Sequence, residues 1–168
     1  MIKWGIIGAG NMGRHFANAI KEVDNAELVA ISSLNNQNLI SFGKEFKIEP
    51  DLQFNEYNKI IKCNEVDAVY ISTLNNTHFD LIEMCALGNK NILCEKPFCL
   101  DLIEANKLKK IIDKSNIKFF EGIAYLSHPQ TKKILDVINN NEIGDVLSIE
   151  SFFGFKVKKI NPNSRLFN

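Results

Sequence analysis

The sequence predicts an α/β protein with a doubly wound parallel sheet, and three observations carry that prediction. Short apolar runs alternate along the chain with stretches in which apolar residues recur at helical spacing. The run VDAVYIST, which starts at Val66, is apolar almost throughout, as is typical of a parallel strand covered on both faces. A glycine-rich turn joins the first apolar run to the first helical stretch. These features favour right-handed strand–helix–strand units.

The alternation gives the expected order of elements over most of the chain. Strands are expected over residues 2–7, 27–32, 66–73, 91–94 and 118–122. Helices are expected over residues 11–22, 37–46, 55–62, 78–87 and 102–114. Gly88 follows the fourth of these helices, at the place where a left-handed C-terminal cap is needed.

The pattern changes after Gly122. A helix is expected over residues 131–140 and a long strand over residues 146–157, and no further strand follows to pair with it. At 168 residues the chain exceeds one small domain but is short for two full ones. We therefore expect a complete α/β domain over residues 1–122 and the beginning of an incomplete α+β domain over residues 123–168.

Charge and hydropathy exclude several classes of partner. Lys and Arg together number 20, as do Asp and Glu, and no block of like charge occurs. Nucleic-acid binders present a basic field to the phosphate backbone, so no nucleic-acid partner is expected. No apolar stretch approaches the ~20 residues of a membrane helix, and the N-terminus MIKWGIIGAG lacks the cleavage pattern of a signal peptide. We expect no membrane partner and a cytoplasmic location.

The four cysteines are expected to be reduced and to pack in the interior. They are Cys63, Cys85, Cys94 and Cys99. No C-x-x-C pair occurs and no histidine lies within a few residues of any of them, whereas a zinc site needs closer ligand spacing. No metal is therefore expected. A redox role for Cys94 and Cys99 is an alternative, but it requires the two thiols to meet across the intervening Glu-Lys-Pro-Phe.

The segment GAGNMG is a complete G-x-G-x-x-G motif, placed between the first expected strand and the first expected helix. In this context Gly8 permits the tight turn, Gly10 lets the backbone approach a pyrophosphate, and Gly13 allows close packing of helix and strand. Asn11 and Met12 lie at the helix N-terminus, whose unpaired N–H groups attract an anion. An ordinary glycine-rich turn is the alternative. The strand and helix around the motif favour a Rossmann-type domain that binds a dinucleotide, NAD or NADP.

The end of the second expected strand bears on the choice between these two dinucleotides. NAD enzymes usually carry an acidic residue there, which accepts a hydrogen bond from the ribose 2′-hydroxyl. This sequence has Ser32, Ser33 and Leu34 instead, so it offers neither an acid to repel a 2′-phosphate nor an arginine to bind it. Serines tolerate a phosphate, which favours NADP slightly over NAD.

The segment STLNNTH follows the most apolar strand, at the carboxyl edge of the sheet where ligands of such folds bind. We expect Asn75 or Asn76 to hydrogen-bond to the ribose or the nicotinamide. His78 is expected to open the next helix. The alternative interpretation is a helix cap followed by a solvated histidine.

The segment ILCEKPF ends another strand at the same edge. Pro97 restricts the backbone of Lys96, which fixes the direction of the lysine side chain. A lysine beside the nicotinamide can transfer a proton to or from a substrate hydroxyl. The alternative is a surface ion pair between Glu95 and Lys96, which contributes about 0 to 1 kcal/mol to stability.

These segments together resemble a known family. GIIGAGNMG, VDAVYISTLNNTH, ILCEKPF, AYLSHP, NNNEIGDVLSIE and NSRLFN occur in the order and spacing of the Gfo/Idh/MocA oxidoreductases. The resemblance covers essentially the whole chain, and G-x-G-x-x-G followed by E-K-P is a specific combination. It implies NAD(P)-dependent hydride transfer at a secondary alcohol or ketone of a small carbohydrate-like substrate: a sugar, a sugar derivative, a polyol or a cyclic diol.

The resemblance also implies roles for particular residues. Lys96 corresponds to the family's catalytic and ribose-contacting lysine, with Glu95 as a neighbour of the cofactor. The family's T-P-N-x-x-H segment corresponds to the stretch that begins at Thr73, which carries over Asn75 and His78 as cofactor contacts.

Two positions depart from the family pattern. Leu74 stands where the T-P-N-x-x-H segment usually has its proline, and Leu126 replaces the usual arginine of a Y-R-x-H-P segment. The second replacement removes one cofactor or substrate contact.

The sequence stops before the later part of a family member, so the resemblance implies an N-terminal portion with the first helix and strand of a substrate domain. A long strand with Phe152 and Phe153 would leave an apolar edge without sheet partners. We therefore expect self-association or a complementing C-terminal polypeptide. A dinucleotide-binding module without turnover is the alternative to an enzyme.

Overall fold

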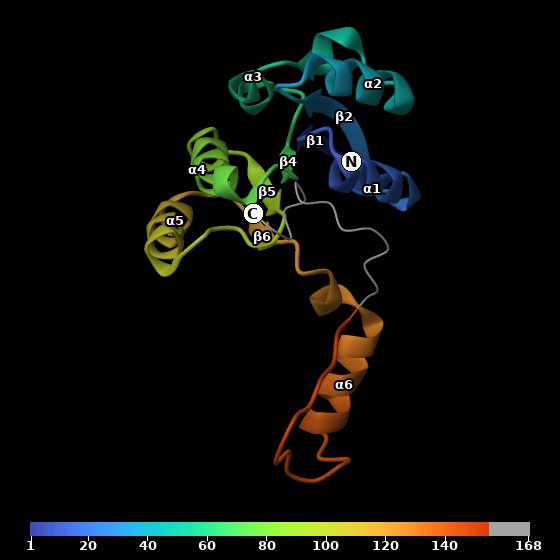
Figure 1. Cartoon of the computed structure of the whole chain (residues 1–168), viewed down its shortest axis with the longest axis vertical. Coiled ribbons are helices and arrows are strands. Elements are labelled where there is room, and N and C mark those ends of the chain that lie inside the picture. Colours follow the sequence, from blue (N-terminus) through green and yellow to red (C-terminus); the bar gives the residue numbers. More distant parts are fainter. Residues whose placement is uncertain (155–168) are drawn as a thin grey trace. The chain divides into compact units, whose positions relative to one another are not determined.

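The computed structural model describes residues 1–154 of the chain (Figure 1). It contains a first compact unit, Met1–Ala124, and a second unit that begins at Tyr125. The expected boundary after Gly122 lies close to this division.

The first unit is built on a parallel sheet of 6 strands, in the order β3-β2-β1-β4-β5-β6. The strands are β1 (Ile2–Ile7), β2 (Ala26–Ser32), β3 (Gln53–Phe54), β4 (Ala68–Ile71), β5 (Asn91–Cys94) and β6 (Phe119–Glu121). Because β4 pairs with the free side of β1, the strand order reverses between these two strands. The predicted doubly wound, Rossmann-type fold is confirmed, and β1 and β4 form its topological switch point.

Helices connect the strands. They are α1 (Asn11–Ala19), η1 (Ile20–Glu22), α2 (Asn36–Phe46), η2 (Pro50–Leu52), α3 (Tyr57–Lys62), η3 (Asn75–Thr77), α4 (His78–Leu87) and α5 (Leu102–Lys114). Successive residues of β1 enter two separate cores: Ile6 packs with Phe42 of α2, and Ile7 packs with Ile82 of α4 and Leu108 of α5. Figure 1 shows α4 and α5 on the side of the sheet opposite α1. Both faces of β1 are therefore buried, which explains its continuous apolar sequence.

The predicted left-handed cap at Gly88 is wrong. Gly88 has a φ of −81°, and the left-handed residue is Asn89, with a φ of 55°. Glycine is required at position 88 for space, because a Cβ there would lie 2.4 Å from a methyl carbon of Ile61. Asparagine tolerates the left-handed conformation better than most residues.

A short helix, η4 (Ala124–Ser127), spans the division between the two units, and the second unit contains the helix α6 (Pro129–Asn139). The sequence predicted that this helix starts at Thr131, but Pro129 occupies its first turn, where a missing N–H is tolerated. The Nδ1 atom of His128 accepts a 3.1 Å hydrogen bond from the backbone N–H of Gln130 and so caps the helix.

The long strand predicted over residues 146–157 is wrong for residues 146–154, which form no strand, and its last residues lie outside the described part of the chain. Leu147, Phe152 and Phe153 are each at least 95% exposed. A strand needs a neighbouring strand that satisfies its backbone N–H and C=O groups. Partial alternation of apolar and polar residues in the sequence does not provide that neighbour.

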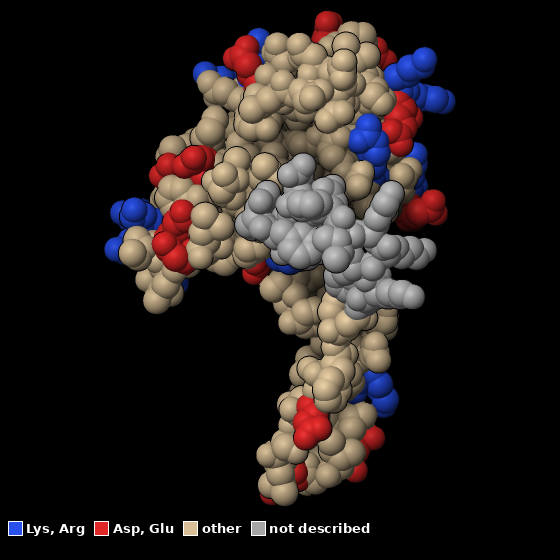
Figure 2. Space-filling model, in the orientation of Figure 1, with Lys and Arg blue, Asp and Glu red and all other residues tan. Residues whose placement is uncertain are grey.

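Figure 2 shows basic and acidic side chains interspersed over the visible surface of the first unit, which is therefore of mixed charge. Over residues 1–154, we find no helix whose length and apolar content would let it span a bilayer.

Candidate functional site

The strands end together at one edge of the sheet. Ile7 of β1 is in register with Ser32 of β2 and with Ile71 of β4, Ile71 with Cys94 of β5, and Cys94 with Glu121 of β6. The segments that follow these residues are therefore neighbours along this edge. They include the glycine turn, STLNNTH and the Glu-Lys-Pro segment, as the sequence predicted for a ligand site of this fold.

The glycine turn is closely packed against the end of β4. Gly8 has a φ of 111°, which only glycine adopts readily, and its carbonyl oxygen accepts a 3.0 Å hydrogen bond from the hydroxyl of Ser72. A Cβ at Gly13 would lie 2.4 Å from that same carbonyl oxygen. Gly8 is therefore required by its backbone conformation and Gly13 by the close packing of the turn, independently of any ligand.

Gly10 differs from these two glycines, because a Cβ there would have no neighbouring atom within 4 Å among residues 1–154. It is the N-cap residue of α1, and neither a side-chain cap nor an acidic side chain occupies the first turn, which contains Asn11 and Met12. By contrast, Asn35 caps α2 and Asp101 caps α5 through their side chains. The first N–H groups of α1 and the open space at Gly10 fit the pyrophosphate of a dinucleotide.

The serines at the end of β2 are turned into the protein. Ser32 is 0% exposed and Ser33 is 7% exposed. The hydroxyl of Ser33 accepts a hydrogen bond from the N–H of Asn35 and donates one to its carbonyl oxygen, both at 3.3 Å. Leu34 is 65% exposed, so its apolar side chain presents the accessible surface at this strand end. The slight preference for NADP stays a prediction.

The turn after β4 is held by its own side chains. The hydroxyl oxygens of Thr73 and Thr77 lie 2.7 Å apart, and that of Thr77 donates to the carbonyl oxygen of Leu74 at 2.8 Å. Asn75 is half-buried and Asn76 is exposed, both within this ordered turn. Their expected contact with a ribose or nicotinamide stays a prediction.

His78 begins α4, as predicted, and the alternative of a solvated histidine is wrong. Its side chain is 0% exposed, and its Nδ1 atom lies 2.7 Å from the carbonyl oxygen of Pro97. The ring therefore contacts the backbone of the Glu-Lys-Pro segment, and its expected contact with the cofactor stays a prediction.

The expected alternative of a Glu95–Lys96 ion pair is wrong. Glu95 is half-buried, and its Oε1 atom accepts a 2.7 Å hydrogen bond from the hydroxyl of Tyr70. Burial first, and then this hydrogen bond, raise the pKa of Tyr70 well above its usual range. Lys96 is exposed, and within residues 1–154 its amine has no ion-pair partner. The bond from Lys96 to Pro97 is cis.

Sequence reasoning missed two residues of this edge, Tyr70 and Glu121. The Oε1 atom of Glu121 accepts a 3.1 Å hydrogen bond from the backbone N–H of Phe98, just beyond the Glu-Lys-Pro segment. A signal for Tyr70 was present, because a tyrosine in a strand buried on both faces needs a partner for its hydroxyl. Glu121 carried no comparable signal.

Two of the four cysteines are fully buried and present no thiol at the surface of this edge. Cys85 and Cys94 are each 0% exposed, and burial raises the pKa of Cys85 to about 12 and that of Cys94 well above its usual range. Thiols held in this way are poor nucleophiles, because the thiolate is the reactive form. This burial disfavours the redox alternative for Cys94 and Cys99. No group of three potential metal-binding side chains occurs in the described part of the chain.

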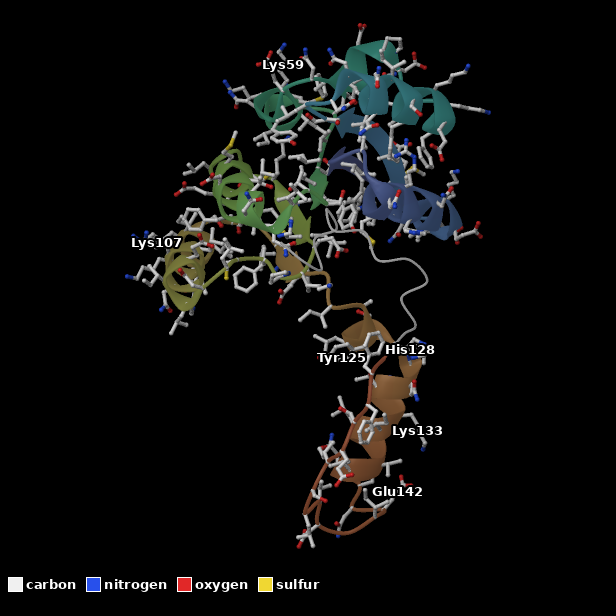
Figure 3. All side chains as sticks on the ribbon, in the orientation of Figure 1. Lys59, Lys107, Tyr125, His128, Lys133 and Glu142 are labelled. Carbon is white, nitrogen blue, oxygen red and sulfur yellow. The ribbon has the colours of Figure 1, made fainter. Side chains whose placement is uncertain are left out.

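Tyr125 and His128 of the segment AYLSHP belong to the second unit, where they lie at the start of α6 (Figure 3). Tyr125 is 65% exposed and Leu126 is 60% exposed.

Comparison with known proteins decides the family. Residues 2–123 match the Gfo/Idh/MocA family, described as an oxidoreductase family with an NAD-binding Rossmann fold. The chain belongs to the Gfo/Idh/MocA oxidoreductase family. The resemblance inferred from the sequence motifs is thereby confirmed.

Two curated relatives illustrate the range of the family. The chain is 32% identical over 153 residues to a glucose-6-phosphate 3-dehydrogenase from Bacillus subtilis, covering 91% of this chain and 42% of the relative. It is 29% identical over 140 residues to a myo-inositol 2-dehydrogenase from Thermotoga maritima, covering 83% of this chain and 41% of the relative. The chain thus spans less than half the length of these relatives.

Solved structures of dehydrogenases share the fold of this chain. The chain superposes with a TM-score of 0.81 and 26% identity on a scyllo-inositol dehydrogenase from Lactobacillus casei with bound NAD(H) and scyllo-inositol, covering 86% of this chain and 43% of that one. A probable dehydrogenase from Thermotoga maritima superposes with a TM-score of 0.80 and 28% identity, covering 85% and 42%. Each of these two structures is matched over less than half of its length.

Proposed function

We propose that the first unit binds a nicotinamide dinucleotide along the edge where the strands end. The observation that carries this proposal is Gly10, whose Cβ position is open while its neighbours in the motif are tightly packed. The uncapped N-terminus of α1 supplies N–H groups for the pyrophosphate at the same place. The end of β2, with Ser32, Ser33 and Leu34, then lies next to the adenosine ribose, and its lack of an acidic side chain slightly favours NADP over NAD.

The proposed activity is that of an NAD(P)-dependent oxidoreductase, with the chain contributing the nucleotide-binding half. When bound, the nicotinamide exchanges a hydride with the secondary alcohol or ketone of a sugar, a sugar derivative, a polyol or a cyclic diol. The substrate class rests on the relatives, which are dehydrogenases of glucose 6-phosphate and of inositols. The second unit would begin the substrate domain.

Lys96 is the proposed proton-transfer residue. It is exposed at the same edge as Gly10, and its amine has no competing ion-pair partner in the described residues. The Nζ atom of Lys96 would accept the hydroxyl proton during oxidation and return it during reduction. The hydroxyl of Tyr70 holds the side chain of Glu95, and Asn75 is a proposed contact of the cofactor.

Binding without turnover is the second candidate function. It is favoured by the position of the motifs, because the glycine turn, STLNNTH and the Glu-Lys-Pro segment all belong to the first unit. A dinucleotide-binding module therefore needs only that unit, whereas turnover also needs a surface that holds the substrate.

Titration of the purified chain with NADH and NADPH tests the proposal, with nucleotide fluorescence as the readout. We expect saturable binding, somewhat tighter for NADPH. The same protein is then assayed for NAD(P)H production with myo-inositol, scyllo-inositol and glucose 6-phosphate. Turnover of any of these supports the oxidoreductase, and binding without turnover supports the module. If circular dichroism shows that the chain is folded but it binds neither nucleotide, both the oxidoreductase and the binding module are overturned.

A further inference from the structure

Three buried or half-buried side chains contact the residues on either side of Lys96. Tyr70 of β4 donates to the carboxylate of Glu95, the residue before the lysine. His78 of α4 contacts the carbonyl oxygen of Pro97, the residue after it. Glu121 of β6 accepts from the N–H of Phe98, one residue further on. Lys96 itself is exposed, and none of these three contacts involves it directly.

We infer that His78 is a positioning residue for Lys96, a role that rests on the proposed proton transfer by this lysine. The carbonyl oxygen of Pro97 can only accept a hydrogen bond, so the Nδ1 atom of His78 carries the hydrogen. This bond of 2.7 Å holds the peptide group between Pro97 and Phe98, one residue beyond Lys96. The ring comes from a different element, the first turn of α4, and so ties the end of β5 to that helix.

Stability does not explain a histidine at this position. The side chain is 0% exposed, and its Nε2 atom is buried without a hydrogen-bond partner among the described residues. A buried polar atom without a partner lowers stability, and an apolar side chain of similar size would avoid that loss. The hydrogen bond from Nδ1 to Pro97 is therefore the property that distinguishes histidine from leucine here.

The position of the bond gives it a catalytic consequence. A proton-transfer group must lie within hydrogen-bond reach of the reacting oxygen, and a displacement of about 1 Å can lower the rate about 100-fold. Tyr70 holds the side chain of Glu95, whereas His78 and Glu121 hold the two ends of the peptide group between Pro97 and Phe98, His78 at its carbonyl oxygen and Glu121 at its N–H. Loss of this contact releases the lysine backbone while leaving the sheet intact.

Two variants separate positioning from stability. His78→Asn keeps an N–H donor near the place of Nδ1, whereas His78→Leu keeps the volume and removes the donor. We expect His78→Leu to unfold at a temperature no lower than the parent chain. If instead His78→Leu is the less stable and His78→Asn is not, the ring is a structural support and the inference is overturned.

Amide hydrogen exchange provides a readout that does not need a ligand. The N–H of Phe98, which donates to Glu121, reports the order of the segment, and the N–H of Glu95, which donates to Ile71 in the sheet, is the internal control. In His78→Leu we expect exchange at Phe98 to accelerate at least about tenfold, with little change at Glu95 and restoration in His78→Asn. Equal exchange at Phe98 in all three proteins overturns the inference.

Lysine acylation then tests the functional half of the inference in the presence of NADH. At an NADH concentration that saturates each protein, we expect NADH to protect Lys96 in the parent chain and in His78→Asn but not in His78→Leu. Lys107, which projects from α5, is the matched exposed control (Figure 3). Equal protection of Lys96 in His78→Leu overturns the positioning role. Absence of NADH binding to the parent chain would reject the proposed function, and the exchange at Phe98 would still decide whether His78 holds the segment.

Discussion

The hydroxyl of Tyr70 donates a 2.7 Å hydrogen bond to the carboxylate of Glu95, the residue that directly precedes Lys96. Tyr70 is only 3% exposed, so its removal leaves a half-buried carboxylate without its partner. We expect Tyr70→Phe to lower the free energy of unfolding by about 1 to 3 kcal/mol, as measured by urea denaturation.

Tyr57→Phe is the matched control for that substitution. Burial raises the pKa of Tyr57 too, but within the described residues its hydroxyl is engaged in no side-chain hydrogen bond. We expect a change within about 0.5 kcal/mol. Similar losses in the two variants would show that the bond to Glu95 contributes nothing specific.

Alkaline pH should destabilise the fold through its buried thiols. Burial raises the pKa of Cys85 to about 12, whereas a thiol in the unfolded chain titrates near 8.5. The unfolded chain therefore loses its proton first, and the stabilisation present below about pH 8.5 declines as the pH rises toward the folded value. Each such thiol lowers the free energy of unfolding by at most about 1.4 kcal/mol per pH unit in this range.

Cys85→Ala tests this pH dependence. The variant should be less stable at pH 7, because it leaves a small cavity, but its free energy of unfolding should fall less steeply between about pH 9 and pH 11. Urea denaturation at several pH values under reducing conditions gives the slope. Parallel slopes for the parent chain and the variant would contradict the assignment.

The fold was predictable because its signals are local and repeated. Ile6, Ile7 and the run from Val66 form continuous apolar stretches, and such stretches between helical patterns specify a parallel sheet. Strand β3, with only Gln53 and Phe54, was missed because two residues carry no periodicity. The predicted strand over residues 146–157 failed where it is described, since alternation within a segment does not provide a neighbouring strand.

The site was only partly predictable, because its contacts join residues distant in sequence. The glycine turn and the Glu-Lys-Pro segment are motifs within a few residues and were found directly. The contacts of Tyr70 with Glu95 and of His78 with Pro97 join residues 25 and 19 positions apart. Periodicity shows that His78 starts a helix, but the depth of its side chain depends on how that helix meets the end of β5.

Substitutions in the glycine motif should separate folding from binding. At Gly13 a Cβ would lie 2.4 Å from the carbonyl oxygen of Gly8, so Gly13→Ala should lower the melting temperature. At Gly10 there is open space and a φ of −86°, so Gly10→Val should leave the melting temperature unchanged while NADH affinity falls at least about tenfold. Retained NADH binding in Gly10→Val would place the pyrophosphate elsewhere.

The end of α4 offers a test of the corrected cap. Gly88→Ala brings a Cβ within 2.4 Å of a methyl carbon of Ile61, and we expect a loss of about 1 to 3 kcal/mol in the free energy of unfolding. Asn89→Gly, at a φ of 55°, should be neutral or slightly stabilising, because glycine adopts this conformation without strain. If Gly88→Ala proved neutral, the close packing against Ile61 would be refuted.

Lys96→Ala tests the central chemical assignment. The side chain is exposed, so its loss should leave the melting temperature within about 1 °C of the parent value. A general acid or base contributes about 10²- to 10⁴-fold to a rate, so any turnover found for the parent chain should fall by that factor. NADH affinity should change only a few-fold, since the pyrophosphate contacts at α1 remain. Lys107→Ala removes an exposed lysine on α5 and should alter none of these quantities. Unchanged turnover in Lys96→Ala would exclude this lysine as the proton-transfer group, whatever its place at the sheet edge.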